Sequence, residues 1–180
     1  MTRIGVFGGQ FDPPHNGHVA AVRTALQQLD LDRLVVVVDS RPPHREASQL
    51  DAGTRGALAT AAFADLGPVT VRVQGPDDSP YMVDTLRSLS AEGELFLIVG
   101  ADQLAALDSW HDADGIRALA TLVVAPRAAA VPIEAAIVLD MQPVDLASTQ
   151  LRERLEAGQD VSADVPAAVL RRLSPGNQAG

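Results

Sequence analysis

The sequence of 180 residues contains no cysteine and no lysine. Without cysteine the chain has neither disulfides nor thiolate metal sites, which excludes zinc fingers and thiol catalysis and favours the cytoplasm as its compartment. The basic side chains are all arginine, so a P-loop, whose lysine binds phosphate, is excluded as well. No apolar run approaches the roughly 20 residues of a membrane-spanning helix, so no membrane association is expected.

Composition and charge narrow the class of protein further. Hydrophobic residues make up 47% and charged residues 21%, which is typical of a soluble globular protein. The length favours one domain, over residues 1–173, followed by a flexible tail over residues 174–180. A net charge of -9 would repel a polyanion, so no nucleic-acid partner is expected, whereas a small phosphate ligand needs only a local group of donors. The oligomeric state stays open, a homo-oligomer included.

Short β-branched segments alternate with alanine- and leucine-rich segments along the chain. We predict strands over residues 3–7, 34–38, 69–73, 95–99, 121–124 and 136–139, all buried on both faces. We predict helices over residues 17–29, 54–64, 83–89, 113–119 and 149–155, the last with Ser148 as N-cap. This alternation predicts an α/β fold with a parallel sheet and helices on both faces.

The strongest motif, GGQFDPPHNGH, follows the first predicted strand and opens the first predicted helix. Its paired glycines, Gly8 and Gly9, allow a sharp turn and close approach of the backbone to a ligand. His15 and His18 would lie on one face of the helix, beside its positive end. The motif therefore predicts a phosphate site with two imidazoles. The alternative is that one histidine only caps the helix and the other packs in the core.

The same segment resembles the signature of the HxGH nucleotidylyltransferase superfamily, and within it the bacterial nicotinate mononucleotide adenylyltransferases. Further segments are similar to those of the family in the expected order, namely RPPHR, PYMVDTL, GADQL, a single tryptophan and LASTQLR. The resemblance covers most of the chain, from Gly8 to Arg152. It implies a Rossmann-like open parallel sheet and transfer of AMP from ATP to nicotinate mononucleotide, giving deamido-NAD and pyrophosphate.

The resemblance also implies roles for individual residues. His15 and His18 would act at the reacting phosphate. The residues implied in ATP binding are Gly8, Gly9, Gln10, Phe11, Gly17, Gly100, Asp102, Ser148, Thr149 and Arg152. Asp102 would accept a hydrogen bond from the ribose of ATP; the alternative is that it only caps a helix. The triphosphate would be held by Ser148, Thr149 and Arg152; the alternative is that they belong to a capped surface helix whose arginine is solvated. Mg²⁺ would arrive with the ATP phosphates, with no metal site made by the protein itself.

Acceptor binding is implied for His44, Arg45, Tyr81, Asp84, Thr85 and Trp110. Trp110 would stack on the pyridine ring, although a lone tryptophan is as often part of a core. The sequence departs from the family pattern at Gln10, Met82, Ala113 and Ala147, which affects the choice of acceptor more than the chemistry. The acceptor therefore stays open between nicotinate mononucleotide, its amide and phosphopantetheine. A cytidylyl transfer and a role as a non-catalytic nucleotide sensor stay open as well.

Overall fold

A six-stranded parallel sheet forms the centre of the protein. The computed structural model describes residues 1–40, 49–126 and 136–173, and the statements below concern those residues. The strands are β1 (Arg3–Gly9), β2 (Arg33–Val38), β3 (Val69–Val73), β4 (Glu94–Gly100), β5 (Ala120–Ala125) and β6 (Ala136–Val138). They pair in the order β3-β2-β1-β4-β5-β6, and every pairing is parallel. This strand order is that of the Rossmann fold, as predicted.

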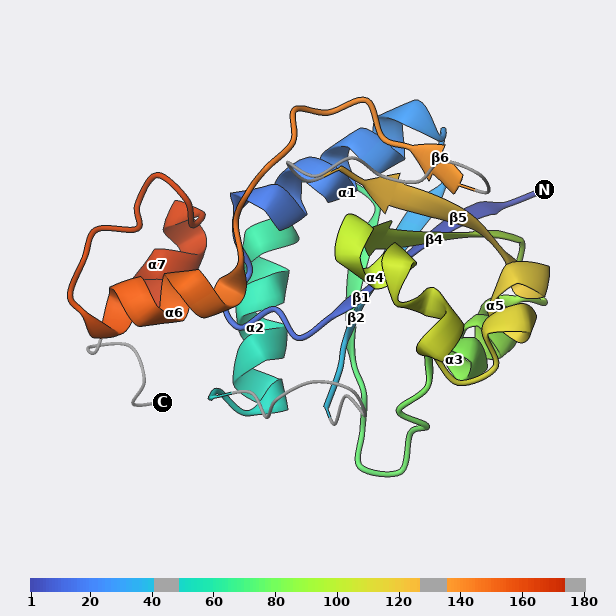
Figure 1. The fold of residues 1–180 in the computed structure, drawn as a ribbon, viewed down its shortest axis with the longest axis horizontal. Helices are drawn as coiled ribbons and strands as arrows, with labels where there is room; N and C mark the ends of the chain where they lie inside the picture. Colours follow the sequence, from blue (N-terminus) through green and yellow to red (C-terminus); the bar gives the residue numbers. More distant parts are fainter. Residues whose placement is uncertain (41–48, 127–135, 174–180) are drawn as a thin grey trace.

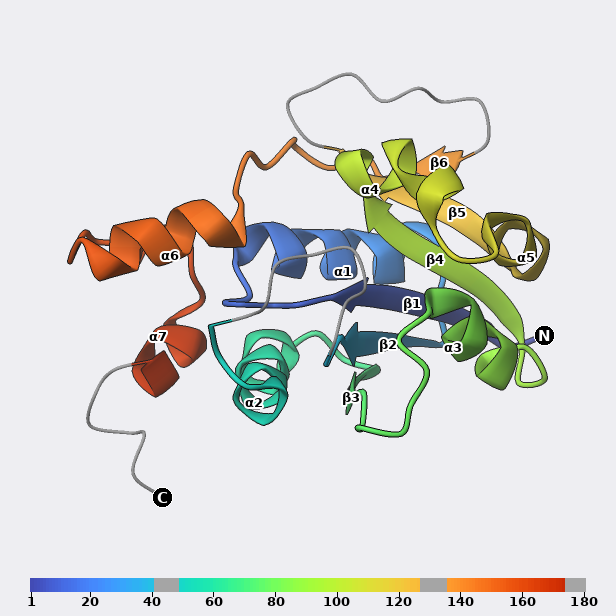
Figure 2. The same ribbon diagram turned by 60° about the horizontal axis from the view of Figure 1, so that its bottom comes forward.

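Helices connect the strands and cover both faces of the sheet (Figure 1). They are α1 (Asn16–Gln28), α2 (Ala52–Phe63), α3 (Met82–Leu89), α4 (Ala101–Ala105), the 3₁₀ helix η1 (Leu107–Ser109), α5 (Ala113–Leu119), α6 (Ser148–Glu156) and α7 (Ala167–Leu173). One face packs against α1 and α2, through apolar residues such as Val22 and Phe63. The other packs against α3, α4, η1 and α5, through residues such as Leu86 and Ile116. Figure 2 shows these two helical layers with the sheet between them.

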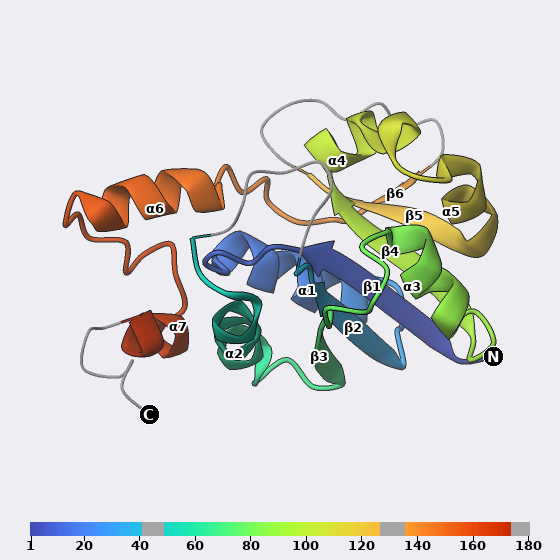
Figure 3. The ribbon, with the colours of Figure 1, turned by 90° about the horizontal axis from the view of Figure 1, so that it is seen from below.

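A third, smaller apolar cluster joins the last two helices to α2. It contains Leu58, Leu151, Val161, Val165 and Val169. Because these side chains pack against α2 and not against the sheet, α6 and α7 extend beyond the sheet, past the carboxyl end of β1 (Figure 3). The cluster thereby places the first turn of α6 beside the loop that follows β1. None of the described helices is both long and apolar enough to span a bilayer.

The order of the strands reverses between β1 and β4, which lie side by side although β2 and β3 separate them in sequence. In open α/β sheets, ligands bind outside the carboxyl ends of the strands at such a reversal. The loops that leave these two strands begin after Gly9 and at Gly100. A ligand site is therefore expected at these two loops.

Most of the predicted elements are confirmed, with small shifts at their ends, and three points differ. Strand β3 is an edge strand with Val73 exposed, so the prediction that it is buried on both faces is wrong. Ala147, and not Ser148, is the N-cap of α6. The short helices α4, η1 and α7 were not predicted, because helices of so few residues carry little periodic signal.

Candidate active site

Two cavities open at the carboxyl end of the sheet and meet there. The histidine cavity, of about 450 Å³, is lined by Phe7, Gly8, Gly9, Gln10, Phe11, His15, Gly17, His18, Ala21, Gly100, Asp102, Gln103, Ala125, Pro126, Met141, Val144, Leu146, Ala147, Ser148, Thr149 and Arg152. The aromatic cavity, of about 310 Å³, is lined by Gly8, Asp39, Gln74, Pro80, Tyr81, Met82, Leu97, Ile98, Val99, Asp102, Gln103, Ala106, Ser109, Trp110, His111 and Ile116. Gly8, Asp102 and Gln103 belong to both linings, so one continuous site can hold two ligands in contact.

The two predicted histidines lie together at the start of α1. His15 is the N-cap residue, and its Nδ1 accepts a hydrogen bond of 3.1 Å from the backbone N–H of Gly17. The Nδ1 of His18 accepts one of 3.1 Å from the backbone N–H of His15. The rings stack with their centroids 3.7 Å apart. A helix capped by this exchange uses two histidines where serine and glutamate are more usual.

This capping determines which ring atoms can serve a ligand. In a neutral imidazole, a nitrogen that accepts a hydrogen bond carries no proton, so the proton of each ring lies on Nε2. Both rings are therefore hydrogen-bond donors through Nε2, and both line the histidine cavity. Capping and ligand binding are thus compatible roles for this pair. Gly17 belongs to the same arrangement, because a Cβ there would lie 3.0 Å from the His15 ring.

The loop between β1 and α1, residues 10–15, has an unusual backbone. Phe11 has a φ of 52°, a left-handed conformation that is costly for a bulky side chain. Its ring is buried and makes edge contacts with Phe7, Phe63 and His18. Aromatic packing thus positions the residue, and through it the path of the loop past the cavity.

The first turn of α6 docks onto this loop. Ser148 Oγ donates to the carbonyl of Pro13 at 2.9 Å, and Arg152 Nη1 donates to the carbonyl of Asp12 at 2.7 Å. Arg152 Nη2 also donates to Thr149 Oγ1 at 3.2 Å. The structure therefore brings all three predicted residues to the histidine cavity, and Arg152 is held by protein partners and is not a freely solvated arginine.

Asp102 lies at the junction of the two cavities, in the first turn of α4. The N-cap of this helix is Gly100, whose backbone N–H donates to Gln103 Oε1 at 3.0 Å. The alternative prediction, that Asp102 caps a helix, is therefore wrong. Its exposed carboxylate is placed where both ligands of the site would be within reach.

The aromatic cavity brings together side chains from the segment before α3 and from the end of η1. The rings of Tyr81 and His111 stack with their centroids 4.1 Å apart, and Trp110 lines the same cavity half-buried. Gln74 lines the same cavity and is buried; its Nε2 donates to the carbonyl of Ser79, and its amide oxygen has no partner among the described residues. Trp110 packs at the edge of the core and is also accessible to a planar ligand.

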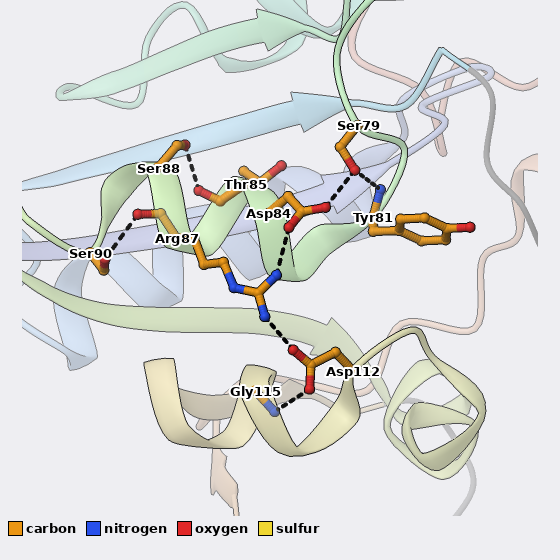
Figure 4. Close-up of polar contacts among 9 residues, drawn as sticks. All are labelled: Ser79, Tyr81, Asp84, Thr85, Arg87, Ser88, Ser90, Asp112 and Gly115. Carbon is orange, nitrogen blue, oxygen red and sulfur yellow. Dashed lines mark hydrogen bonds and ion pairs between the residues drawn. The ribbon is translucent and has the colours of Figure 1, made fainter.

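Asp84 and Thr85 do not line either cavity. Figure 4 shows the Asp84 carboxylate accepting from Ser79 Oγ at 2.6 Å and from Arg87 at 2.7 Å, while Arg87 also pairs with Asp112. The hydrogen bond from Ser79, followed by that from Arg87, lowers the pKa of Asp84. The carboxylate thus holds Arg87, and Arg87 joins α3 to the N-cap residue of α5, Asp112. The predicted contact of Asp84 and Thr85 with an acceptor stays a prediction. His44 and Arg45 lie outside the described residues.

Arg55, on α2, is a buried charged residue for which no sequence motif indicates a function. It is 1% exposed and donates to the carbonyls of Leu50 and Gln10. Burial lowers the pKa of its guanidinium, which the carboxylates of Asp12, Asp39 and Asp51 partly offset. Gln103, Gln74 and Asp39 are further residues of the site that sequence reasoning missed, because no motif distinguishes them from ordinary loop or helix residues.

The chain matches one family model and many curated proteins. A model described as cytidylyltransferase-like matches residues 6–154. A protein of Albidiferax ferrireducens named "Probable nicotinate-nucleotide adenylyltransferase" is 39% identical over 193 residues, covering 97% of this chain and 96% of that protein. A protein of Thermus thermophilus with the same name is 39% identical over 176 residues, covering 93% and 94%.

Solved structures agree on the fold. The Plasmodium falciparum nicotinic acid mononucleotide adenylyltransferase complexed with NaAD matches with a TM-score of 0.81 at 11% identity, over 95% of this chain and 94% of that one. The same protein complexed with APC matches with a TM-score of 0.76 at 13% identity, over the same shares of the two chains. With the sheet order, the paired histidines and the curated relatives in agreement, this chain belongs to the cytidylyltransferase-like family and, within it, to the nicotinate-nucleotide adenylyltransferases.

Proposed function

We propose that this enzyme transfers the AMP portion of ATP to nicotinate mononucleotide, giving deamido-NAD and pyrophosphate. The observation that carries the proposal is the meeting of two unlike cavities at Gly8, Asp102 and Gln103. One cavity offers imidazole, hydroxyl and arginine donors at a helix N-terminus, which suits a triphosphate. The other offers aromatic rings, which suit a flat heterocycle. A nucleotidyl transfer needs both ligands side by side.

The reaction needs little covalent chemistry from the protein. A phosphate oxygen of the acceptor attacks the α-phosphorus of ATP, a new P–O bond forms, and the bond to the β-phosphate oxygen breaks to release pyrophosphate. The attacking phosphate is already ionised at neutral pH, so no general base is required. The work of the protein is to hold two anions together and to stabilise the charge that develops in the transition state.

His15 and His18 fit this task because their Nδ1 atoms are occupied by backbone amides. The Nε2–H groups are thereby fixed in orientation before the substrate binds, so no reorganisation is needed as the charge develops. We assign His18 to the α-phosphate and the leaving group, with His15 beside it. Ser148, Thr149 and Arg152 would hold the remaining phosphates at the N-terminus of α6.

We further propose that Mg²⁺ enters with the ATP phosphates. The described residues contain no group of three His, Cys, Asp or Glu that could hold a metal ion, and the histidine cavity offers the single carboxylate of Asp102. This donor set fits Mg²⁺, which usually keeps several waters and binds to substrate phosphates with one or two carboxylates. When bound, the ion would neutralise part of the negative charge on the phosphates.

In the aromatic cavity we assign Trp110 and Tyr81 to the nicotinate ring and its ribose. Both residues line the cavity that Gly8 also lines. A side chain at Gly8 would collide with Met82, because a Cβ there would lie 2.4 Å from Met82 Cε. Met82 is one of the departures from the family pattern, and it lines the aromatic cavity beside Gly8, a residue that both cavities share. The acceptor would therefore meet a thioether where the family pattern has a hydroxyl.

A pyrophosphate-release assay tests the proposal directly. The enzyme would be incubated with ATP, Mg²⁺ and, separately, nicotinate mononucleotide, its amide and phosphopantetheine, with CTP replacing ATP in a parallel series. The proposal predicts the highest kcat/KM for ATP with nicotinate mononucleotide. A higher value for another pair would reassign the substrate, and nucleotide binding without pyrophosphate release would indicate a sensor.

A further inference from the structure

A buried cation lies under the loop that follows β1. Arg55 exposes 1% of its surface, although arginine is almost never fully buried without partners. Its Nε donates to the carbonyl of Leu50 at 3.0 Å, and its Nη1 donates to the carbonyl of Gln10 at 2.7 Å. It is too deeply buried to reach a substrate, so its two hydrogen bonds must serve the protein backbone.

The bond to Gln10 fixes one particular peptide unit. A trans peptide is planar, with its C=O and N–H pointing in opposite directions, and the peptide bond between Gln10 and Phe11 is trans. Because the carbonyl of Gln10 points toward Arg55, the N–H of Phe11 points away from it. Both residues line the histidine cavity. The guanidinium thus turns a carbonyl inward and an amide donor outward at the place where phosphates would bind.

The backbone at this peptide would not hold its shape unaided. Phe11, the residue after the fixed carbonyl, has its left-handed φ of 52°. Such conformations persist in bulky residues only where the surroundings over-determine them. Arg55 supplies part of that restraint from α2, while Gln49 N–H, bonded to the Asp12 carboxylate at 2.8 Å, and Arg152, bonded to the Asp12 carbonyl, hold the next residue.

We propose that Arg55 is a positioning residue for adenylyl transfer, holding the peptide between Gln10 and Phe11 so that the amide of Phe11 faces the phosphates of ATP. The inference rests on the proposed function for the identity of the nucleotide. An arginine is required because two nitrogens of one rigid, planar guanidinium donate to two separate carbonyls, those of Leu50 and Gln10. A lysine ammonium has the charge but lacks the planar arrangement of N–H donors, and a methionine fills the space with neither the charge nor the donors.

The test compares R55M and R55K with L95A. Leu95 is buried near the amino end of β4 and lines neither cavity, so L95A lowers stability without touching the loop. Each variant would be assayed below its own unfolding temperature, for kcat, for KM and for affinity toward a non-hydrolysable ATP analogue. We expect kcat to fall about 100-fold in R55M and about tenfold in R55K, as misplacement of a catalytic group implies. Analogue affinity should fall about threefold to tenfold in R55M, since ground-state contacts lose less than those of the transition state.

Several outcomes would overturn the inference. One is a kcat of R55M within about threefold of the wild-type value. Another is a loss of kcat in L95A as large as that in R55M, because destabilisation alone would then explain the effect. If R55M does not fold, R55K decides, and a wild-type kcat in R55K excludes the role. The analogue titration separates this proposal from the proposed function. If the wild type releases no pyrophosphate, the proposed function fails, but the role of Arg55 can still be tested. An affinity of R55M for the ATP analogue equal to that of the wild type would then exclude a positioning role for Arg55 in the loop.

Discussion

The two cavities are built by different physical means. In the histidine cavity four functional side chains are held by the backbone: two amides orient the imidazoles of His15 and His18, and two carbonyls of the loop accept from Ser148 and Arg152. In the aromatic cavity the rings of Tyr81 and His111 stack on each other, and the segments next to them, α3 and the start of α5, are joined by ion pairs of Arg87 with Asp84 and Asp112, all partly exposed. Hydrogen bonds to the backbone fix both distance and direction, whereas stacked rings and surface ion pairs can adjust. The first cavity therefore suits a fixed reaction, and the second suits a specificity that can change.

The largest effect should come from the histidine cavity. H18A removes the Nε2 donor and also the acceptor for the amide of His15, so we expect kcat to fall about 100-fold to 1,000-fold, as for loss of an oxyanion donor. Binding of a non-hydrolysable ATP analogue should persist, because the lost contact is made mainly in the transition state. Pyrophosphate release and calorimetry measure the two quantities. In contrast H111A, in the aromatic cavity, should raise KM for the acceptor; a kcat loss equal to that of H18A would abolish the distinction between the cavities.

The next effect tests the docking of α6 onto the loop. R152M removes the hydrogen bonds to the Asp12 carbonyl and to Thr149, and with them a donor for the triphosphate, so KM for ATP should rise about tenfold. R154M is the matched control on the same helix, because its guanidinium pairs with Asp164 and lies outside both cavities. It should lower the unfolding temperature and leave KM for ATP unchanged. Equal values of KM in the two variants would show that α6 acts only as a support.

The parts of the site that could be predicted from the sequence are those that use local spacing. His15, Gly17 and His18 lie within one helical turn, so their proximity follows from residue numbers alone. A role for Ser148 and Arg152 in ATP binding was predicted through family resemblance alone, and their docking onto the loop was not predicted, since 135 and 140 residues separate them from their partners there. Their bonds to Pro13 and Asp12 depend on the third apolar cluster, which no local pattern reveals.

The parts that could not be predicted depend on long-range burial. Arg55 lies on a helix whose sequence provides no hint that its guanidinium is enclosed, because enclosure requires the loop after β1 and the carbonyl of Leu50 to close over it. The prediction that β3 is buried on both faces failed for the same reason. VTVRV has the composition of a buried strand, but β3 lies at the edge of the sheet, and no strand pairs with its outer side in the described part of the chain. Sequence pattern reports local preference, and the neighbours of an element decide its burial.

A smaller effect should appear in the aromatic cavity. W110A removes the largest flat surface from its lining, and a ring stack contributes about 0.5–1.5 kcal/mol, so KM for nicotinate mononucleotide should rise up to about tenfold. W110F retains a ring and should lose less. Steady-state kinetics with each substrate varied in turn give the measurement, and KM for ATP is expected to stay within about twofold of wild type. An unchanged acceptor KM, together with a lower unfolding temperature, would assign Trp110 to the core alone.

The smallest effect concerns the ion pairs of Arg87 with Asp84 and Asp112, which join α3 to the start of α5, and it depends on pH. The hydrogen bonds from Ser79 and Arg87 lower the pKa of Asp84 below its ordinary value of 3.8, so the unfolded chain binds a proton more readily than the folded one. The resulting stability is fully present above about pH 4 and is lost as the pH falls through the lowered pKa. D84N should therefore unfold about 1–3 °C below wild type at neutral pH, a small difference because the pair is partly exposed to solvent. Thermal unfolding at neutral pH and near pH 3 checks this, with the gap between the two proteins narrowing in acid. A gap that stays constant with pH would mean that the carboxylate contributes by packing and not by charge, and the contrast drawn between adjustable ion pairs here and backbone hydrogen bonds in the histidine cavity would lose its support.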